Sequence, residues 1–189
     1  MRLLVATQNE HKKKEIQEIL KDHFEIVSLK DLQDYDEVDE TKDTFFENAL
    51  LKASYFAKKH QMLTLADDTG LCVDALNGAP GVLSQRYSGL GDESNIDLLL
   101  DELKDSSNRE AYFMTVLVLY NPKDLRYQSF KGRLEGVILK ERRGQNGFGY
   151  DSVFFLPEHN KTLAEMDEHE KNSLSHRALA LETLKEALS

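Results

Sequence analysis

Two adjacent carboxylates, Asp67 and Asp68, follow a short apolar run and precede a threonine and a glycine. The run 63–66 predicts a strand that ends at the two acids. Because strand side chains alternate between faces, the two carboxylates then point in different directions, so one can bind a hard cation while the other orients water. Mg²⁺ takes one or two carboxylates and completes its coordination with water and substrate phosphates. A solvated surface turn is the alternative, since Asp-Asp-Thr-Gly also suits a turn.

A second polar stretch, residues 7–12, follows an apolar run and precedes a segment with helical spacing. A strand, a polar loop and a helix in this order favour an anion site, because the first helical turn presents free backbone N–H groups and a partial positive charge. Thr7, Asn9 and Lys12 add a hydroxyl, an amide and an ammonium. Lysines 12–14 stand where the helix dipole disfavours cations, which suggests a negatively charged ligand. A capped helix with a basic first turn is the alternative.

The segment 44–60 has the most regular helical pattern, with a capping box at its start and an apolar stripe along one side. On this helix, Asn48 and Lys52 lie one turn apart, off the stripe, and could face the same ligand. Asp39 and Glu40 stand just before the helix. Either could bind a metal, although charged loop residues are more often simply solvated.

The C-terminal third contains a glycine-rich loop, residues 144–151, that carries two aromatic rings. Its glycines admit unusual backbone conformations and let a flat ligand approach, but without the Walker spacing the signal is weak by itself. His176 and Arg177 occupy the first turn of a final amphipathic helix, where cations are unfavourable, so we favour a ligand as the explanation. Arg86 stands among small and aromatic residues, either in a surface loop or as a clamp for phosphate oxygens.

Composition limits the class of protein. A chain of 189 residues suits one domain, or one domain with two lobes, and its 40% hydrophobic content argues against disorder. A net charge of -10 argues against general nucleic-acid binding, which needs a basic surface. The single cysteine, Cys72, excludes an internal disulfide and a cysteine zinc cluster. Because no signal peptide or membrane span is recognisable, we expect a soluble cytoplasmic protein with no nucleic-acid or membrane partner.

Hydrophobic patterns predict an α/β chain. Strands are expected at 3–6, 25–29, 63–66, 71–73, 111–120, 127–139 and 153–156, and helices after residue 12, over 44–60, over 96–103, from 167 and from 176. The two longest strands are expected to form a β-hairpin across residues 121–124. No linker, repeat or low-complexity segment stands out, so we expect one domain over residues 1–189.

Taken in order, these motifs resemble the inosine triphosphate pyrophosphatase family, the dITP/XTP pyrophosphatases that remove deaminated purine nucleotides. The matching stretches span almost the whole chain: Thr7–Lys12 as T-x-N-x-x-K, Thr44–Ala53, Ala66–Leu71, Gly78–Gly81, Phe148–Asp151, and Lys171 with Ser175–Arg177. The resemblance implies an elongated, twisted mixed β-sheet with flanking helices. It also implies two lobes around a central cleft that holds the substrate, and a homodimer.

The resemblance further implies roles for individual residues. Asp68 is the expected catalytic acid-base residue and Mg²⁺ ligand, and Glu40 is expected as the second ligand, with Asp39 as its rival. Substrate contacts are implied for Thr7, Gln8, Asn9, Glu10, His11, Lys12, Thr69, Phe148, Gly149, Tyr150, Asp151, Lys171, His176 and Arg177, to which the charge of a triphosphate adds Lys52 and Arg86.

The expected reaction is in-line attack on the α-phosphorus by water activated near Asp68 and Mg²⁺, with release of pyrophosphate. The position of cleavage is implied by the resemblance. A 6-oxo purine offers an acceptor at O6 and a donor at N1, whereas adenine offers the reverse. Donors from His176 or Arg177, an acceptor near Asp151 and stacking by Phe148 therefore favour ITP, dITP and XTP over ATP.

Two alternative functions remain open. A Maf-like pyrophosphatase for other nucleotides would use similar chemistry, but Phe148 and the stretch Ser175–Arg177 argue against it. A nucleotide sensor without turnover would be expected to lack a carboxylate at Asp67, Asp68 or Glu40, and all three are present.

Overall fold

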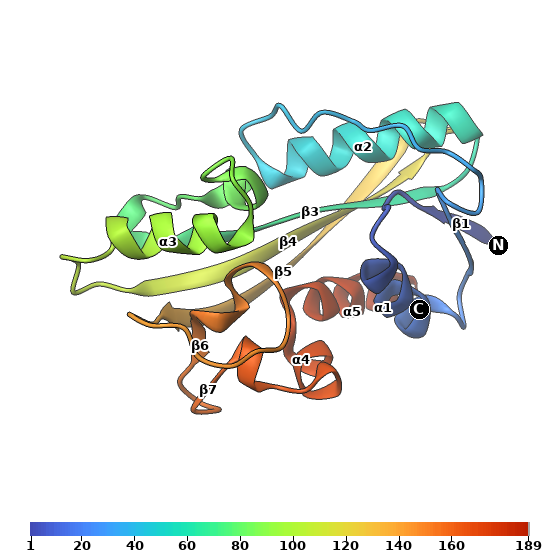
Figure 1. Ribbon diagram of the computed structural model, residues 1–189. Helices are drawn as coiled ribbons and strands as arrows, with labels where there is room; N and C mark the ends of the chain where they lie inside the picture. Colours follow the sequence, from blue (N-terminus) through green and yellow to red (C-terminus); the bar gives the residue numbers. More distant parts are fainter. Residues whose placement is uncertain (189) are drawn as a thin grey trace. The chain divides into compact units, whose positions relative to one another are not determined.

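A mixed β-sheet with flanking helices forms the frame of the protein in a computed structural model (Figure 1). The structure describes residues 1–188, except for the side chain of His11. The strands are β1 (Arg2–Val5), β2 (Glu25–Ser28), β3 (Thr64–Val73), β4 (Glu110–Asn121), β5 (Arg126–Ile138), β6 (Phe154–Leu156) and β7 (Lys161–Thr162). The α-helices are α1 (Glu10–Leu20), α2 (Phe45–His60), α3 (Asp92–Glu102), α4 (Glu168–Leu174) and α5 (His176–Leu188).

The seven strands form one open sheet in the order β2-β1-β3-β4-β5-β6-β7. β1 pairs in parallel with both β2 and β3, whereas β6 pairs antiparallel with β5 and with β7. The expected α/β class and mixed sheet are therefore confirmed. The expected pairing of the two longest strands is confirmed as well, since β4 and β5 are neighbours in the sheet and are joined by residues 122–125. None of the helices in residues 1–188 is both long and apolar enough to cross a membrane.

The chain divides into two compact units. Unit 1 contains residues 1–68, 115–132 and those from 177 onward, and unit 2 contains residues 69–114 and 133–176. Each unit has its own hydrophobic core and is described by itself below. The assignment of a single domain and the central cleft remain predictions.

In unit 1, alternate side chains of β1 and β3 belong to two different cores. Leu3, Val5 and Leu65 pack with residues of α1 and α5, whereas Leu4 and Ala66 pack with residues of α2. α1 and α5 therefore cover one face of these strands and α2 covers the other. The alternation continues along β3, so Asp67 is directed to the face that α1 and α5 cover, and Asp68 to the face that α2 covers.

The start of α2 follows the predicted capping pattern. Thr44 has an extended backbone and its Oγ1 accepts a hydrogen bond from Glu47 N at 3.2 Å. Instead of reaching back to the backbone of Thr44, the Glu47 carboxylate accepts the Thr44 hydroxyl at 2.7 Å. The helix ends at His60, and Gln61 follows in the left-handed conformation. The predicted bounds of this helix are thus confirmed.

β3 is longer than the sequence predicted. Segments 63–66 and 71–73 were expected as separate strands, with the acids at the end of the first, but β3 continues without a break from Thr64 to Val73. Both the strand-end position and the surface-turn alternative are therefore wrong. A strand can contain the two adjacent acids because each buried carboxylate has polar partners, which offset the cost of removing it from water.

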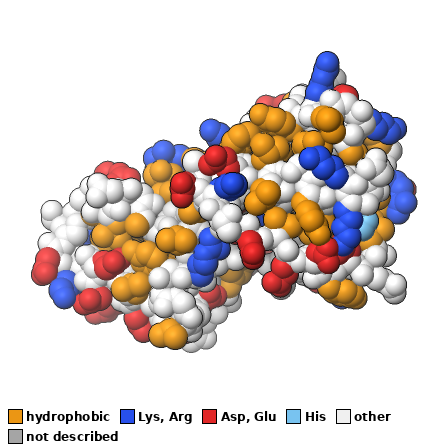
Figure 2. Space-filling view, turned by 90° about the horizontal axis from the view of Figure 1, so that it is seen from above, with side chains coloured by type: hydrophobic (Ala, Val, Ile, Leu, Met, Phe, Trp, Pro, Cys, Tyr) orange, Lys and Arg blue, Asp and Glu red, His pale blue; other side chains and the backbone are white. Residues whose placement is uncertain are grey.

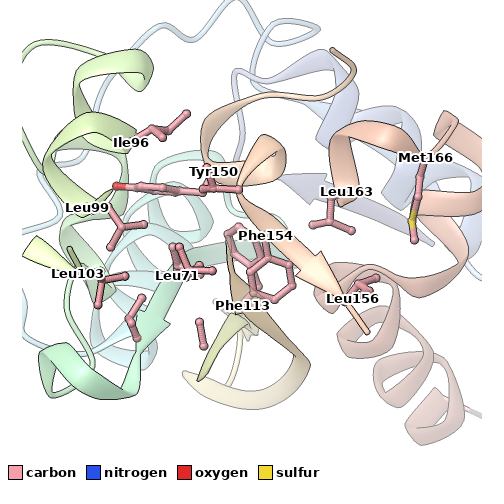
Figure 3. Packing of buried hydrophobic residues seen from close by; sticks show 14 residues of the cluster. Leu71, Ile96, Leu99, Leu103, Phe113, Tyr150, Phe154, Leu156, Leu163 and Met166 are labelled. Atoms are coloured by element: carbon pink, nitrogen blue, oxygen red, sulfur yellow. The ribbon is translucent and has the colours of Figure 1, made fainter. Parts of the chain in front are cut away.

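The core of unit 2 gathers around α3 and β6 (Figure 3). Figure 3 shows the ring of Tyr150 directed into this cluster, with its hydroxyl end toward the side on which Ile96 and Leu99 of α3 lie. α3 begins at Asp92, four residues before the predicted start at 96, with Gly91 at its N-terminal end. Tyr150 itself lies in a short 3₁₀ helix, Gly149–Ser152, within the glycine-rich segment.

Candidate functional site

Asp67 lies at the centre of a charged cluster in unit 1. Its carboxylate is buried, with Lys12 Nζ 2.8 Å from Oδ2 and Arg177 Nε 3.7 Å from the same oxygen. Burial alone would raise the pKa of Asp67, but the positive charges of Lys12 and Arg177, together with that of Lys52, hold this pKa well below its ordinary value. The surrounding cations therefore favour the ionised form of Asp67.

Asp68 is equally buried but has a different neighbour. Asn48 of α2 donates a hydrogen bond from Nδ2 to Asp68 Oδ2 at 3.0 Å. The Asn48 amide is itself fixed, since its Oδ1 accepts from the backbone N of Lys42 at 2.9 Å and the side chain has no exposed surface. The sequence suggested that Asn48 faces a ligand together with Lys52. The amide instead orients Asp68, on the face of β3 that α2 covers.

Lys52, one turn along α2 from Asn48, donates a hydrogen bond to Glu40. Burial tends to lower the pKa of Lys52, but the negative charges of Asp67, Glu40 and Asp68 together raise it, so the ammonium is retained. Glu40 is half-buried, whereas Asp39 beside it is exposed. The loop before α2 thus brings one of the two candidate carboxylates into the same charged region as Asp68.

The loop before α1 uses its own polar side chains to hold its shape. Asn9 N donates to Thr7 Oγ1 at 3.2 Å, and Lys12 N donates to Asn9 Oδ1 at 3.3 Å, so Asn9 satisfies a free N–H group of the first helical turn. Further along, Lys13 Nζ lies 3.0 Å from Asp31 Oδ2. Two of the three consecutive lysines therefore have carboxylate partners within the chain, and no external anion is needed to explain their position.

The other predicted residues of this loop are more peripheral. Gln8 is exposed and donates from Nε2 to the carbonyl oxygen of Asp34 at 3.0 Å. Glu10 is exposed and lies 3.5 Å from Lys30 Nζ. The side chain of His11 lies outside the described residues.

In unit 2, Asp151 and Lys171 assemble the glycine-rich loop around Phe148. Asp151 Oδ2 accepts from Lys171 Nζ at 2.5 Å and from Phe148 N at 3.0 Å. Lys171 Nζ also lies 4.8 Å from the centre of the Phe148 ring, which is 59% exposed. Gly147 has a φ of +79°, and a Cβ there would meet Asp151 Oδ2 at 2.1 Å. The glycine is therefore needed both for its backbone conformation and to make room for this carboxylate.

The same loop is bonded to the turn that contains Arg86. The buried hydroxyl of Tyr150 donates to the carbonyl oxygen of Ser84 at 2.8 Å. Asn95 of α3 donates to the carbonyl oxygens of Ser84 and Gln85 at 3.4 and 3.2 Å. Arg86 itself is exposed. Two segments that are far apart in the sequence, and that both contain predicted substrate contacts, are thus joined within unit 2.

The remaining predicted residues are divided between the two units. The half-buried Thr69 and Gly149 belong to unit 2, where Gly149 N donates to Asp92 Oδ2 at 3.1 Å. The His176 ring stacks on Phe113 of the same unit, with ring centres 5.0 Å apart. Arg177, the next residue, belongs to unit 1 and donates from Nη1 to Glu15 Oε2 at 2.9 Å.

Comparison of the whole chain with known proteins identifies its family. The sequence model of the Ham1 family matches residues 3–187 of this chain. The chain belongs to the Ham1 family. It is 46% identical over 188 residues to a protein of Staphylococcus epidermidis named dITP/XTP pyrophosphatase, covering 98% of this chain and 95% of that protein. It is 48% identical over 192 residues to a protein of the same name from Geobacter sulfurreducens, covering 99% of this chain and 96% of that protein.

The fold agrees with solved Ham1 proteins. The structure of a HAM1 protein from Coxiella burnetii matches with a TM-score of 0.94 at 42% identity, over 100% of this chain and 98% of that one. The Ham1-family assignment confirms the resemblance inferred from the motifs.

Sequence reasoning missed several residues that shape this Ham1 site. Asn48 was noticed, but its bond to Asp68 was not predicted. Glu15 and Asn95 were overlooked, although each is a polar residue beside an apolar position of a helix, Ile16 and Ile96. Buried polar residues at such positions need partners, and this is the signal that could have identified them.

Proposed function

We propose that this Ham1-family chain hydrolyses the non-standard purine nucleoside triphosphates ITP, dITP and XTP to the monophosphate and pyrophosphate. The observation that carries the proposal is the match of nearly the whole chain to relatives named dITP/XTP pyrophosphatase. The arrangement of charged residues in unit 1 and of the Phe148 loop in unit 2 supports it.

Asp68 is proposed as the residue that accepts a proton from the attacking water. Its buried carboxylate is oriented by Asn48, and Asn48 in turn is fixed by the backbone of Lys42. A base held in one orientation does not have to reorganise when the reaction begins. In the proposed step, water oxygen bonds to the α-phosphorus, the bond from this phosphorus to the bridging oxygen breaks, and pyrophosphate leaves with the electron pair.

We propose Mg²⁺ as the cofactor, held by Asp68 and Glu40. Within residues 1–188, no group of three or more His, Cys, Asp or Glu side chains could hold a metal ion. That donor set still fits magnesium, which needs only one or two carboxylates and takes its other ligands from water and substrate phosphates. The bound ion would neutralise phosphate charge and acidify water. Glu40 is preferred to Asp39 because only Glu40 is half-buried beside Lys52.

Two ammonium groups of unit 1 are proposed to bind the triphosphate. Lys12 and Lys52 are both held by carboxylates, at Asp67 and Glu40. Because these anions also raise the pKa of Lys52, its charge is available to the substrate at neutral pH. Cations fixed before binding stabilise negative charge at a low cost of reorganisation. Arg86 of unit 2 is proposed as a further phosphate contact.

The base is proposed to stack on Phe148. This ring is exposed, although its backbone N–H and the neighbouring Lys171 are both fixed by Asp151. Asp151 is proposed as the acceptor for N1–H of a 6-oxo purine, and His176 or Arg177 as the donor to its O6, whereas adenine would leave such groups unpaired. Sites built on hydrogen bonds reject a mismatched partner strongly.

A homodimer and a cytoplasmic location are also proposed. Figure 2 shows hydrophobic side chains among charged ones on the face where α2 lies, and Tyr55 of α2, Leu125 and Tyr127 of unit 1 are 41%, 63% and 49% exposed. Exposed aromatic residues are enriched at protein interfaces. Light scattering of the purified chain tests the dimer. The cytoplasm is the compartment in which nucleoside triphosphates are used, and fractionation of cells tests the location.

Product analysis tests the reaction itself. Incubation of ITP with the protein and Mg²⁺, followed by anion-exchange separation, is expected to give IMP and pyrophosphate in equal amounts. Formation of IDP and orthophosphate would contradict cleavage at the α-phosphorus. Binding of ITP without any product would favour a nucleotide sensor, and faster cleavage of pyrimidine nucleotides would favour a Maf-like enzyme.

A further inference from the structure

A buried network of four charged side chains joins three elements of unit 1. Lys12 of α1 lies 2.8 Å from Asp67 of β3, and Arg177 of α5 lies 2.9 Å from Glu15 of α1. Arg177 Nε is 3.7 Å from Asp67 Oδ2, and this contact joins the two ion pairs into one continuous network. Asp67, Glu15 and Arg177 are 4%, 8% and 8% exposed. The network contains two positive and two negative groups.

The network is poorly explained by stability alone. Burying charges is costly, and apolar residues of similar size often serve stability as well or better than a buried ion pair. Moreover, Arg177 Nε has no hydrogen-bond partner among the described residues, although it is buried. An arrangement that is costly and incompletely bonded points to a role for the charges themselves.

We propose that Asp67 is a positioning residue, whose carboxylate fixes the Lys12 ammonium for substrate binding and takes no part in metal binding or proton transfer. The proposal rests on the proposed function. Three features support it: Asp67 lies on the face of β3 covered by α1 and α5, one of its oxygens faces two cations, and its neighbour Asp68 lies on the other face with Asn48. The two carboxylates therefore have separate tasks.

The role predicts a specific kinetic pattern. Without the Asp67 charge, Lys12 is free to adopt other rotamers, so its ammonium must be ordered again whenever substrate binds. Because Asp67 acts through Lys12, loss of Asp67 should matter less when Lys12 has already been removed. A residue that binds the metal or takes the proton would instead lower turnover whether or not Lys12 is present.

The test is a double-mutant cycle with Asp67→Asn, Lys12→Met and the double variant, assayed with ITP at saturating Mg²⁺. We expect Asp67→Asn to raise KM about tenfold or more, in the range for hydrogen bonds to charged groups, with kcat changed less than about threefold. The double variant should have nearly the KM of Lys12→Met alone. Multiplicative effects on KM, an unchanged KM, or a fall in kcat like that of Asp68→Asn would overturn the proposal.

Asp31→Asn is the matched control, because Asp31 pairs with Lys13, the next residue of the same helix, at 3.0 Å. Its KM should equal that of the wild type, and a KM raised as in Asp67→Asn would overturn the specific role of Asp67. If Asp67→Asn alone fails to fold, the double variant remains informative, since it loses one charge of each sign and keeps the network balanced. The double variant must then have nearly the KM and the kcat of Lys12→Met. A kcat much lower than that of Lys12→Met would overturn the proposal.

Calorimetric titration with ITP separates this role from the proposed reaction. The dissociation constants of the same variants should follow the pattern predicted for KM, and this measurement needs no turnover. If the wild type released no pyrophosphate but Asp67→Asn still bound ITP more weakly than the wild type, the reaction would be rejected and the positioning role kept. If the wild type released pyrophosphate normally and Asp67→Asn bound ITP as tightly as the wild type, the reaction would be kept and the positioning role rejected.

Discussion

Asp67 and Asp68 are neighbours in β3, but their carboxylates have partners on different helices. Lys12 of α1 lies 2.8 Å from Asp67, and Asn48 of α2 donates to Asp68 at 3.0 Å. The alternation of a strand places these two helices on opposite faces, so one dipeptide serves two separate networks. A cation pairs with Asp67 and a neutral amide orients Asp68, which suits the first to holding charge and the second to exchanging a proton.

Replacing the proposed base is the first prediction. Asp68→Asn preserves the shape of the side chain but removes its proton acceptor and an anionic metal ligand. We expect kcat for ITP to fall at least ~100-fold, the lower range for general acid-base catalysis, while ITP still binds. Steady-state kinetics and calorimetry measure the two effects. Turnover near that of the wild type would move the base to another carboxylate, with Glu40 the next candidate.

The orientation of Asp68 by Asn48 gives a second prediction. Asn48→Ala removes the donor to the buried carboxylate of Asp68 and the acceptor of the backbone N–H of Lys42. The free energy of unfolding should fall by about 1–3 kcal/mol, the usual cost of an unsatisfied buried group, and kcat should fall more than KM changes. Urea denaturation and ITP kinetics measure both quantities. Ser54→Ala on the same helix is the control, and equal kinetics in the two variants would refute an orienting role for Asn48.

Tyr150 gives a third prediction, because its hydroxyl joins the Phe148 loop to the Arg86 turn through Ser84. Tyr150→Phe keeps the ring in the core but removes that bond, so stability should fall by about 1 kcal/mol and KM for ITP should rise. Tyr87→Phe is a matched control, since the Tyr87 hydroxyl donates to the carboxylate of Glu102 at the surface. A KM that rises equally in both variants would show that the Tyr150 bond has no special part in substrate binding.

Acid stability gives a fourth prediction. Burial would raise the pKa of Asp34, but hydrogen bonds from Lys59, the Asp36 backbone and His60 lower it from 3.8 to about 2. Because the folded state holds this pKa below its unfolded value, the stabilisation is present above pH 3.8 and is lost as pH falls toward 2. The urea midpoint of the wild type should therefore drop over this range, and that of Asp34→Asn should drop less.

The control for this measurement is Asp101→Asn, which removes an exposed carboxylate 3.2 Å from Lys104. Such surface pairs contribute little to stability, so its acid profile should match that of the wild type. If Asp34→Asn also followed the wild-type profile, the acid sensitivity would have to come from other carboxylates.

Local patterns predicted more of the fold than of the site. Helix α2, which Thr44 caps, was predictable from its capping pattern, and strand β1 was predictable from the apolar run at 3–6 to within one residue at each end. Both signals act between near neighbours in the sequence. The continuation of β3 through Asp67 was not predictable in this way, because Asp-Asp-Thr-Gly has turn chemistry by itself. Its strand conformation depends on Lys12 and Asn48, residues that the fold brings from far along the chain.

The pairing of charged residues in the site could not be predicted from local sequence patterns either. Three lysines at the start of α1 looked like a sign of an external anion, but Asp67 and Asp31 supply internal partners. Likewise, Arg177 meets Glu15 from 162 positions away. Pairings over such separations depend on tertiary structure, so residue type and spacing could nominate the charged residues without showing which of them neutralise each other.

The most direct test of the central claim is kcat/KM for pyrophosphate release from ITP, dITP, XTP, GTP and ATP, with Mg²⁺ and with excess chelator. Two mismatched hydrogen bonds suffice for roughly a hundredfold discrimination, so ITP, dITP and XTP should exceed ATP by at least about that factor, with GTP between them. Activity should vanish in chelator. Equal values for ITP and ATP would contradict a role in removing non-standard purines, and full activity in chelator would contradict the proposed magnesium chemistry.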